Sequence, residues 1–436
     1  MATLAYEVRR RDPELVGPAS ETPQETKSMS DLDSMDVMRS QASTALFYRG
    51  GEGEDGADPA GVIRRALGEA LVHYYPLAGR LREIEGRKLV VDCTGEGVLF
   101  VEADADVKLA DLEAAGLRPP FPCMDQLLFD VEGSNGILNC PLLLVQVTRL
   151  LCGGFVLALR CNHAMCDAIG IAQFINAVSE LARGLPTITV KPVWCRELIL
   201  TRDPVVPRPS VPRTKPNVLP PPMVERSFTF RASDVVAMKK SLPLPLCDTA
   251  TSFEILAAFL WRARTTALDI SPGDIAPLVI GVNFRGDARL SLPVGYYGNA
   301  VTTSTVLADA AVLRSGSLGE AVALVRQGKA VGATEHFRSM ANGTEVRGSR
   351  TFNPANLFAV SDTRNIGFHR MDFGWGEPVF AGPITTFFPM CYFIRVKDRD
   401  GEDAYVMPLM LPQPQPAMDR FAAEVKRSLL EDAKHM

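Results

Sequence analysis

Residues 155–184 read FVLALRCNHAMCDAIGIAQFINAVSELARG, and this stretch decides the local fold. It opens with a continuous apolar run typical of a buried strand, and it continues with apolar side chains spaced three and four apart, as on one helix face. Asp167 is a natural N-cap for that helix and Gly184 a natural C-cap. The pattern therefore predicts a strand, a tight turn and a helix, and it places His163 on the turn.

The longest apolar region, residues 141–158, is interrupted by Gln146, Arg149 and Gly153. A membrane helix needs about 20 consecutive apolar residues, whereas two short apolar runs around a glycine turn indicate a hairpin. We therefore expect two strands that lead directly into the turn, and no membrane segment.

Other segments alternate between helical and extended patterns. Thr251 and Glu254 have the spacing of a capping box ahead of a helical run. We expect helices over residues 61–73 and 255–267, and strands over 88–91, 98–101, 142–147, 155–161 and 278–284. Mixed alternation of this kind is typical of α/β layers.

The chain length favours two domains. Single cores rarely grow beyond roughly 250 to 300 residues, and this chain has 436 residues, 47% of them hydrophobic. Residues 186–222 contain ten of the 32 prolines, so this segment lacks backbone donors for a sheet. We expect a domain over 1–187, an extended linker over 188–222 with a short helical stretch near 194–200, and a domain over 223–436.

Charge and cysteine content exclude several classes of protein. With 46 Lys and Arg against 51 Asp and Glu and a net charge of -5, the chain offers no basic surface for nucleic acid or anionic membranes. Its nine cysteines form no Cys-x-x-Cys pair, which favours free thiols. Cys161, His163 and Cys166 supply only three of the four ligands of structural zinc, so we expect no metal site.

No targeting segment is evident, so the expected location is cytoplasmic, with a peroxisomal one left open.

Five segments, in order along the chain, resemble the BAHD acyltransferases of plants. A His-x-x-x-Asp spacing alone is weak, but His163 and Asp167 stand among four companions. The matching segments are residues 73–81, 163–170, 251–264, 283–300 with its run Gly-Tyr-Tyr-Gly-Asn-Ala, and 372–376, which read Asp-Phe-Gly-Trp-Gly. The Asp-Phe-Gly letters do not indicate a kinase, because no phosphate loop or catalytic-loop signature accompanies them.

The resemblance implies an α/β fold like that of chloramphenicol acetyltransferase. Two similarly sized domains would each hold a mixed sheet with flanking helices, and an active-site channel would run through their interface. His163 would be the general base, and acyl-CoA a co-substrate rather than a bound cofactor. Imidazole suits the base on chemical grounds too, since its pKa of about 6.5 allows proton uptake near neutral pH. Asp167 is implied to be structural and paired with Arg285, which agrees with its N-cap position.

The resemblance also assigns roles to residues outside the turn. Structural residues at the active site would be Asp372, Gly374, Trp375 and Gly376. Coenzyme-binding residues would be Thr251, Ser252, Ser361 and Asp362, although Thr251 is also explained as a helix cap. The segment 385–388, which reads Thr-Thr-Phe-Phe, places Thr386 and Phe387 on the acceptor side.

Within the family, the chain is most similar to the benzyl alcohol benzoyltransferase group, and the similarity lies in residues 191–194, 293–300 and 360–362. The expected reaction is therefore transfer of an acyl group, benzoyl first, to a small alcohol such as benzyl alcohol, by a monomer. Three alternatives stay open: an amine acceptor such as tryptamine or tyramine, a non-catalytic ligand-binding relative, and a hydrolase that uses Cys166.

Overall fold

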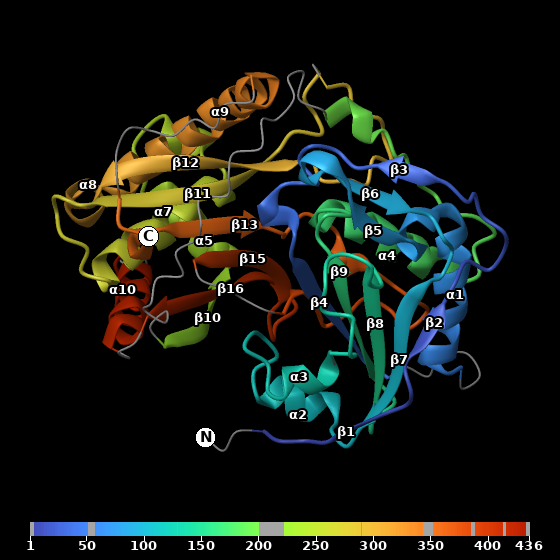
Figure 1. Cartoon of the computed structure of the whole chain (residues 1–436). Coiled ribbons are helices and arrows are strands. Elements are labelled where there is room, and N and C mark those ends of the chain that lie inside the picture. Colours follow the sequence, from blue (N-terminus) through green and yellow to red (C-terminus); the bar gives the residue numbers. More distant parts are fainter. Residues whose placement is uncertain are drawn as a thin grey trace. The chain divides into compact units, whose positions relative to one another are not determined.

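The chain folds into two compact units, each built from separate parts of the sequence. The computed structural model describes residues 4–50, 57–128, 130–199, 222–288, 290–342, 352–384, 389–412 and 416–432. The first unit comprises Met1–Thr201, Arg285–Ala300 and Asn365–Thr385, and the second comprises Arg202–Phe284, Val301–Arg364 and Thr386–Met436. Figure 1 follows the chain through both units by colour.

The first unit contains most of the N-terminal strands and two long helices. Its strands are β1 (Val8–Arg10), β2 (Glu14–Val16), β3 (Thr26–Ser28), β4 (Gln41–Tyr48), β5 (Arg80–Glu83), β6 (Leu89–Asp92), β7 (Val98–Ala105), β8 (Leu143–Leu150), β9 (Phe155–Asn162) and β14 (Phe380–Pro383). Its helices are α1 (Pro59–His73), α2 (Leu109–Ala114), α3 (Met124–Leu127) and α4 (Ala168–Ala182), with short 3-10 turns η1 (Asp36–Met38), η3 (Tyr75–Ala78), η4 (Glu85–Arg87), η5 (Arg196–Ile199) and η7 (Phe368–Arg370).

A seven-stranded mixed sheet organises this unit. Its strand order is β1-β7-β8-β9-β4-β14, with β2 also paired to β7, and β7 and β8 are parallel while β8 and β9 are antiparallel. The predicted hairpin is thus confirmed, and Leu150 N–H donates to Gly154 O at 2.8 Å across its turn. A smaller sheet, β3-β6-β5, completes the unit.

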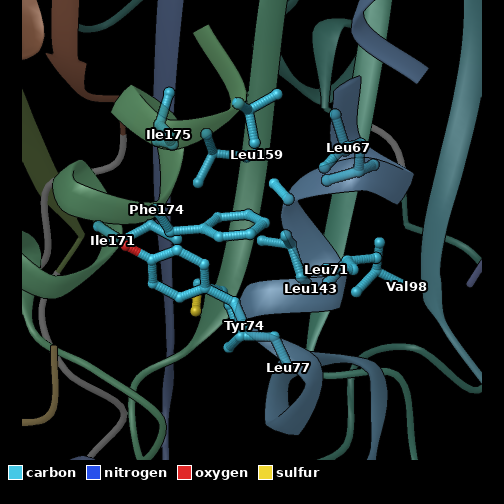
Figure 2. Packing of buried hydrophobic residues seen from close by; sticks show 14 of the residues in the cluster. Leu67, Leu71, Tyr74, Leu77, Val98, Leu143, Leu159, Ile171, Phe174 and Ile175 are labelled. Atoms are coloured by element: carbon cyan, nitrogen blue, oxygen red, sulfur yellow. The ribbon is translucent and has the colours of Figure 1, made fainter. Parts of the chain in front are cut away.

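Helices α1 and α4 pack together against one face of the large sheet (Figure 2). Leu67 and Leu71 of α1 and Phe174 of α4 have exposed fractions of 2% or less, as expected from their helical spacing. The ring of Tyr74, just after α1, lies edge-on to Phe174 with centroids 5.1 Å apart. Each buried side chain of this size contributes about 1.5 to 3 kcal/mol, so the helical spacing of apolar residues fixes α4 to the sheet.

The second unit repeats the design with a six-stranded mixed sheet. Its strands, β10 (Met223–Arg231), β11 (Ile275–Asn283), β12 (Val301–Asp309), β13 (Phe358–Asp362), β15 (Met390–Lys397) and β16 (Asp403–Pro412), run in the order β10-β16-β15-β13-β11-β12. Its helices are α5 (Ala232–Lys240), α6 (Leu246–Thr249), α7 (Ser252–Ala267), α8 (Ala310–Ser315), α9 (Leu318–Asn342) and α10 (Pro416–Asp432), with a 3-10 turn η6 (Pro354–Asn356).

Helix α7 is the centre of the second core. It contacts α5, α8, α9 and α10 as well as β13, and 13 of its residues are buried, including the fully enclosed Trp261. A helix that is apolar on nearly all sides lies inside a protein. The predicted helix over 255–267 therefore forms, and its observed start at Ser252 follows the predicted capping box.

The compact units are discontinuous, whereas the expected domains were continuous segments. Strand β14, late in the sequence, pairs with β4 of the first unit, and residues 285–300 also join that unit. Residues 188–199 of the expected linker belong to the first unit and include η5, while 200–221 lie outside the described residues. Within the described ranges, no helix has the length and apolar character needed to cross a membrane.

Candidate active site

His163 lies on the turn between β9 and α4, as the sequence predicts. Its backbone N–H donates to Ser40 O at 2.9 Å, and the Asn162 side chain accepts from Ala164 N–H at 3.2 Å. The residue is half-buried, and its ring atom Nδ1 is covered and has no hydrogen-bond partner among the described residues. The backbone of the turn is therefore fixed, while the imidazole is not tied to another described side chain.

Asp167 closes the turn and is fully occupied by hydrogen bonds. Oδ1 accepts from the backbone N–H groups of Ile169 at 3.0 Å and Gly170 at 3.1 Å, so Asp167 is the predicted N-cap of α4. Arg285 donates to both carboxylate oxygens at 2.9 Å, and Ala300 N–H donates to Oδ2 at 2.9 Å. These five bonds leave Asp167 anchoring the turn, and the predicted pair with Arg285 is present.

Residues 295–300 pack tightly against the start of α4. A Cβ atom on Gly170 would lie 2.0 Å from Tyr297 O and 2.7 Å from the Cβ of Cys166. Only glycine permits this approach, because both distances are shorter than any that real Cβ atoms show. Gly170 therefore brings the segment that carries Ala300 close enough to bond with Asp167.

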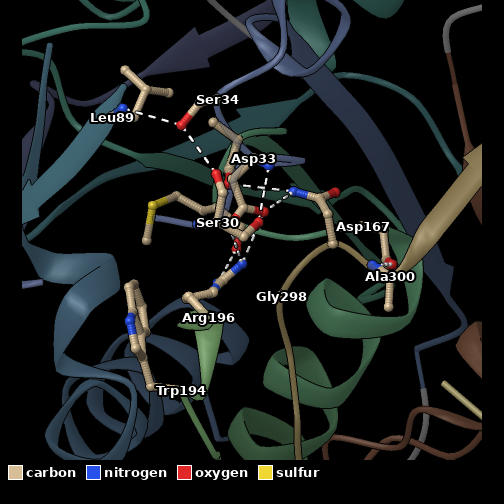
Figure 3. A network of polar contacts seen from close by, with 12 residues as sticks. Ser30, Asp33, Ser34, Leu89, Asp167, Trp194, Arg196, Gly298 and Ala300 are labelled. Carbon is tan, nitrogen blue, oxygen red and sulfur yellow. Dashed lines mark hydrogen bonds and ion pairs between the residues drawn. The ribbon is translucent and has the colours of Figure 1, made fainter. Parts of the chain in front are cut away.

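A second, deeper ion pair lies behind the turn (Figure 3). Asp33 is completely buried and Arg196 is 1% exposed, and Arg196 Nη1 lies 3.0 and 2.9 Å from the two Asp33 oxygens. The guanidinium also lies over the Trp194 ring at 4.5 Å. Burial acts to lower the pKa of Arg196, but the Asp33 carboxylate and two nearby tyrosines more than offset it, so the net pKa is raised. Arg196 therefore stays charged although it is buried.

The loop with the Asp-Phe-Gly-Trp-Gly sequence is a folded structural element of the first unit. Asp372 Oδ1 accepts from Gly374 N–H at 2.7 Å and from Gly376 N–H at 2.9 Å, and both glycines have positive φ. Phe373 is buried against Tyr48, and Trp375 meets Phe155 edge-on at 5.3 Å. The loop is thus held by contacts within the first unit, and the roles of Asp372, Gly374, Trp375 and Gly376 at the active site stay predictions.

In the second unit, Thr251 caps α7. Its hydroxyl accepts from Glu254 N–H at 3.3 Å, and Glu254 accepts from Thr251 N–H at 3.0 Å. Arg326 and Lys329 of α9 lie 3.0 and 3.5 Å from the Glu254 carboxylate. Burial acts to raise the pKa of Glu254, but the Thr251 N–H and the two cations outweigh it, so the pKa is lowered.

Ser252 and Asp362 both bond to the buried Arg364. Arg364 is 3% exposed, pairs with both Asp362 oxygens at 2.8 and 2.7 Å, and donates to the Ser252 hydroxyl at 3.2 Å. Ser361 lies next to Asp362 on β13, opposite Tyr392 of β15. Three of the four residues predicted on the coenzyme side thus lie around one strand end, and Thr251 adjoins Ser252 in sequence.

The family of the chain follows from its sequence match. The Transferase family model matches residues 6–427. The chain belongs to this family, the BAHD acyltransferases.

Relatives of this BAHD acyltransferase cover nearly the whole chain. It is 43% identical over 445 residues to benzyl alcohol O-benzoyltransferase from Petunia hybrida and 44% identical over 444 residues to that from Nicotiana tabacum. Both alignments cover 99% of this chain and 95% of the relative. It is also 41% identical over 442 residues to alcohol acyl transferase 1 allele GSa from Malus domestica, with 98% and 95% covered.

Solved structures share the fold. Vinorine synthase superimposes with a TM-score of 0.70 at 23% identity, covering 95% of this chain and 96% of that one. F. sporotrichioides TRI101 complexed with coenzyme A and T-2 superimposes with a TM-score of 0.68 at 18% identity, covering 92% and 97%. The predicted two-domain α/β fold with mixed sheets and flanking helices is confirmed.

The cysteines beside the BAHD histidine are poorly suited to nucleophilic catalysis. Cys161 and Cys166 are both buried, with sulfur atoms 3.8 Å apart. The contact with Cys161, then burial, raises the pKa of the Cys166 thiol well above its ordinary value. A protonated, buried thiol is a weak nucleophile, which argues against a cysteine hydrolase. Among the described residues, no group of three or more His, Cys, Asp or Glu side chains is arranged to hold a metal ion.

Two residues near the BAHD histidine turn, Asp33 and Arg196, were not predicted from the sequence. Asp33 lies in a segment to which no role was assigned, and Arg196 lies in the short helical stretch of the expected linker. Thr386 and Phe387, predicted on the acceptor side, lie outside the described residues.

Proposed function

We propose that this BAHD acyltransferase moves an acyl group from an acyl-CoA thioester, benzoyl-CoA first, to a small alcohol such as benzyl alcohol. The names of the relatives at 43% and 44% identity support this choice of substrates. The observation that carries the chemistry is the half-buried His163, held on a fixed turn beside an aspartate that is engaged elsewhere.

In the proposed reaction, His163 acts as general base. A ring nitrogen of the imidazole takes the proton of the acceptor hydroxyl while the oxygen attacks the thioester carbonyl carbon. The tetrahedral intermediate then collapses, the carbon–sulfur bond breaks, and the coenzyme thiolate leaves with the proton that the imidazolium returns. The products are an ester and free coenzyme A, with no covalent enzyme intermediate.

Asp167 serves this mechanism through structure rather than through proton transfer. Both of its oxygens are already bonded to Arg285 and to backbone N–H groups. A carboxylate with these bonds does not orient the imidazole, as the aspartate of a Ser-His-Asp triad does. His163 is therefore the side chain that takes up and returns the proton in this mechanism.

The coenzyme side is proposed to involve Thr251, Ser252, Ser361 and Asp362. TRI101, which shares the fold, was solved with coenzyme A, in support of acyl-CoA as the co-substrate. The Ser252 hydroxyl accepts from Arg364, which leaves its own proton for a ligand. Roles for Thr386 and Phe387 on the acceptor side, the channel between domains, a monomeric state and a cytoplasmic location stay predictions.

The test is a matrix of acyl-CoA donors against alcohols and amines, read by mass spectrometry of the products. Benzoyl-CoA with benzyl alcohol is expected to give benzyl benzoate, with a higher kcat/KM than acetyl-CoA or malonyl-CoA. Amide formation from tryptamine or tyramine, at rates above ester formation, would assign the acceptor class to amines. Absence of any acyl product from the whole matrix would point to a non-catalytic relative.

A further inference from the structure

Three successive backbone carbonyls of the histidine turn are held by two buried side chains. Asn299 Nδ2 donates to His163 O at 2.8 Å and to Ala164 O at 3.3 Å. Arg196 Nη2 donates to Met165 O at 2.6 Å. The backbone from 163 to 165 is thus fixed on its carbonyl side, while the N–H of His163 is fixed by Ser40 O.

Both donors are aligned by the same carboxylate, that of Asp33. It accepts from Arg196 Nη1 through both oxygens, from Asn299 Nδ2 at 2.8 Å, and from Ser30 N–H at 2.9 Å. Asp33 and Asn299 are completely buried and Arg196 nearly so. Figure 3 shows Arg196 and Asp33 meeting beside the segment that carries Gly298 and Ala300. These buried groups hydrogen-bond to one another and to the turn, while Asn299 Oδ1 and Arg196 Nε have no hydrogen-bond partner among the described residues. The hydrogen bonds that are present restrict the geometry of the turn.

The imidazole of His163 lacks the usual orienting partner. Its Nδ1 is covered but has no hydrogen-bond partner among the described residues, and both Asp167 oxygens are occupied by other donors. The direction of the ring therefore depends on the backbone at His163. That backbone is what Asn299 and Arg196 hold.

We infer that Asn299 and Arg196, aligned by Asp33, are positioning residues that orient His163 through its backbone carbonyls. This inference rests on the proposed role of His163 as base. Displacement of a catalytic group by about 1 Å can cost about 100-fold in rate, so loss of this support lowers turnover without removing a group that touches substrate.

The test compares Asn299→Ala with a matched control, Asn356→Ala. Asn356 is also a buried amide whose Nδ2 donates to a backbone carbonyl, Ile275 O at 3.2 Å, but it lies in the second unit. Kinetics are measured with benzoyl-CoA and benzyl alcohol at a temperature where both variants are folded by circular dichroism. Asn299→Ala is expected to lower kcat about 10- to 100-fold while KM for the donor changes less than about three-fold. Asn356→Ala is expected to keep kcat.

A double-mutant cycle separates positioning from general destabilisation. In a His163→Ala background, Asn299→Ala is expected to cause no further loss, because it acts only through the imidazole. An equal loss in both backgrounds, or a folded Asn299→Ala protein with kcat within about three-fold of wild type, overturns the inference. Near wild-type turnover of His163→Ala itself would instead refute the general base and, with it, the positioning role.

If Asn299→Ala does not fold, Arg196→Lys replaces it in the same cycle. Lysine keeps the charge opposite Asp33 but lacks the planar fork that reaches both Asp33 and Met165 O. The expected kcat loss and the absence of a further loss in the His163→Ala background are the same. An equal loss in both backgrounds, or a folded Arg196→Lys protein with kcat within about three-fold of wild type, overturns the inference.

Discussion

Asp167 and Arg285 lie 118 positions apart in the chain, and the guanidinium donates to both carboxylate oxygens at 2.9 Å. Asp167 is 5% exposed and the Arg285 side chain 17%, so the pair is shielded from water. Arg285 also donates to Gly298 O at 2.6 Å, and Ala300 N–H donates to Asp167. One ion pair therefore joins the histidine turn to residues 285–300, far along the chain.

Removal of either partner of this pair is expected to destabilise the protein. Asp167→Ala leaves the Arg285 charge without its carboxylate and should lower the free energy of unfolding by about 3 to 5 kcal/mol. Activity should fall with it, because the turn loses its anchor. Urea unfolding measures the change.

The control for the ion pair is Arg82→Ala. Arg82 pairs with Asp92 at 2.9 Å on the surface, where solvent already screens the interaction. This variant should unfold close to wild type. Equal stability of Asp167→Ala and Arg82→Ala would contradict the anchoring role of Asp167.

His163→Ala is expected to separate catalysis from stability. Loss of a general base lowers kcat by roughly 10²- to 10⁴-fold. The half-buried ring makes no hydrogen bond through Nδ1 to a described residue, so the melting temperature should change little. Steady-state kinetics and thermal unfolding of the same preparation test both statements. A folded variant with near wild-type kcat would remove His163 from the mechanism.

The capping box of α7 predicts a pH dependence of stability. The pKa of Glu254 lies below its ordinary value of 4.5, so its ionised form stabilises the folded state. That contribution is complete above about pH 4.5, the unfolded-state value, and is lost as pH falls through the lower folded-state pKa. Wild type should therefore exceed Glu254→Gln in unfolding free energy by more at about pH 7 than at about pH 3. A difference that grows on acidification would show a raised pKa instead.

Gly170→Ala is expected to disturb the histidine turn. The added Cβ meets Tyr297 O at 2.0 Å, a backbone atom that cannot rotate away, so the variant should lose about 1 to 3 kcal/mol and some activity. Gly273→Ala is the control, because its Cβ would have no atom within 4 Å. Chemical denaturation of the two variants, with kinetics alongside, distinguishes them. Equal unfolding midpoints would show that the 295–300 segment moves to accommodate the methyl group.

Features that depend on residues a few positions apart were predictable. The N-cap of α4 joins Asp167 to N–H groups two and three positions later, and the box of Thr251 and Glu254 spans three. The hairpin β8–β9 joins adjacent strands through a short turn. Local hydrogen bonds and apolar periodicity follow from residue order alone, so the strand, turn and helix around His163 appear in the sequence.

The pair of Asp167 and Arg285 was expected only from family resemblance, because nothing local links two residues so far apart. The ion pair of Asp33 with Arg196, 163 positions apart, and the bond from Asn299 to Asp33, across 266 positions, were not foreseen. The pairing of strand β14 with β4 was not foreseen either, because it also joins segments that lie far apart in the sequence.

The sequence by itself determined several of the helices and strands, the place of His163 on a turn and the family of the chain. Only the tertiary structure decided which distant side chains surround that turn. Burial supplies the physical reason. A charge such as Asp33 is tolerated inside a protein only when the fold brings its partners within hydrogen-bond distance, and chain topology rather than local pattern sets which residues those are.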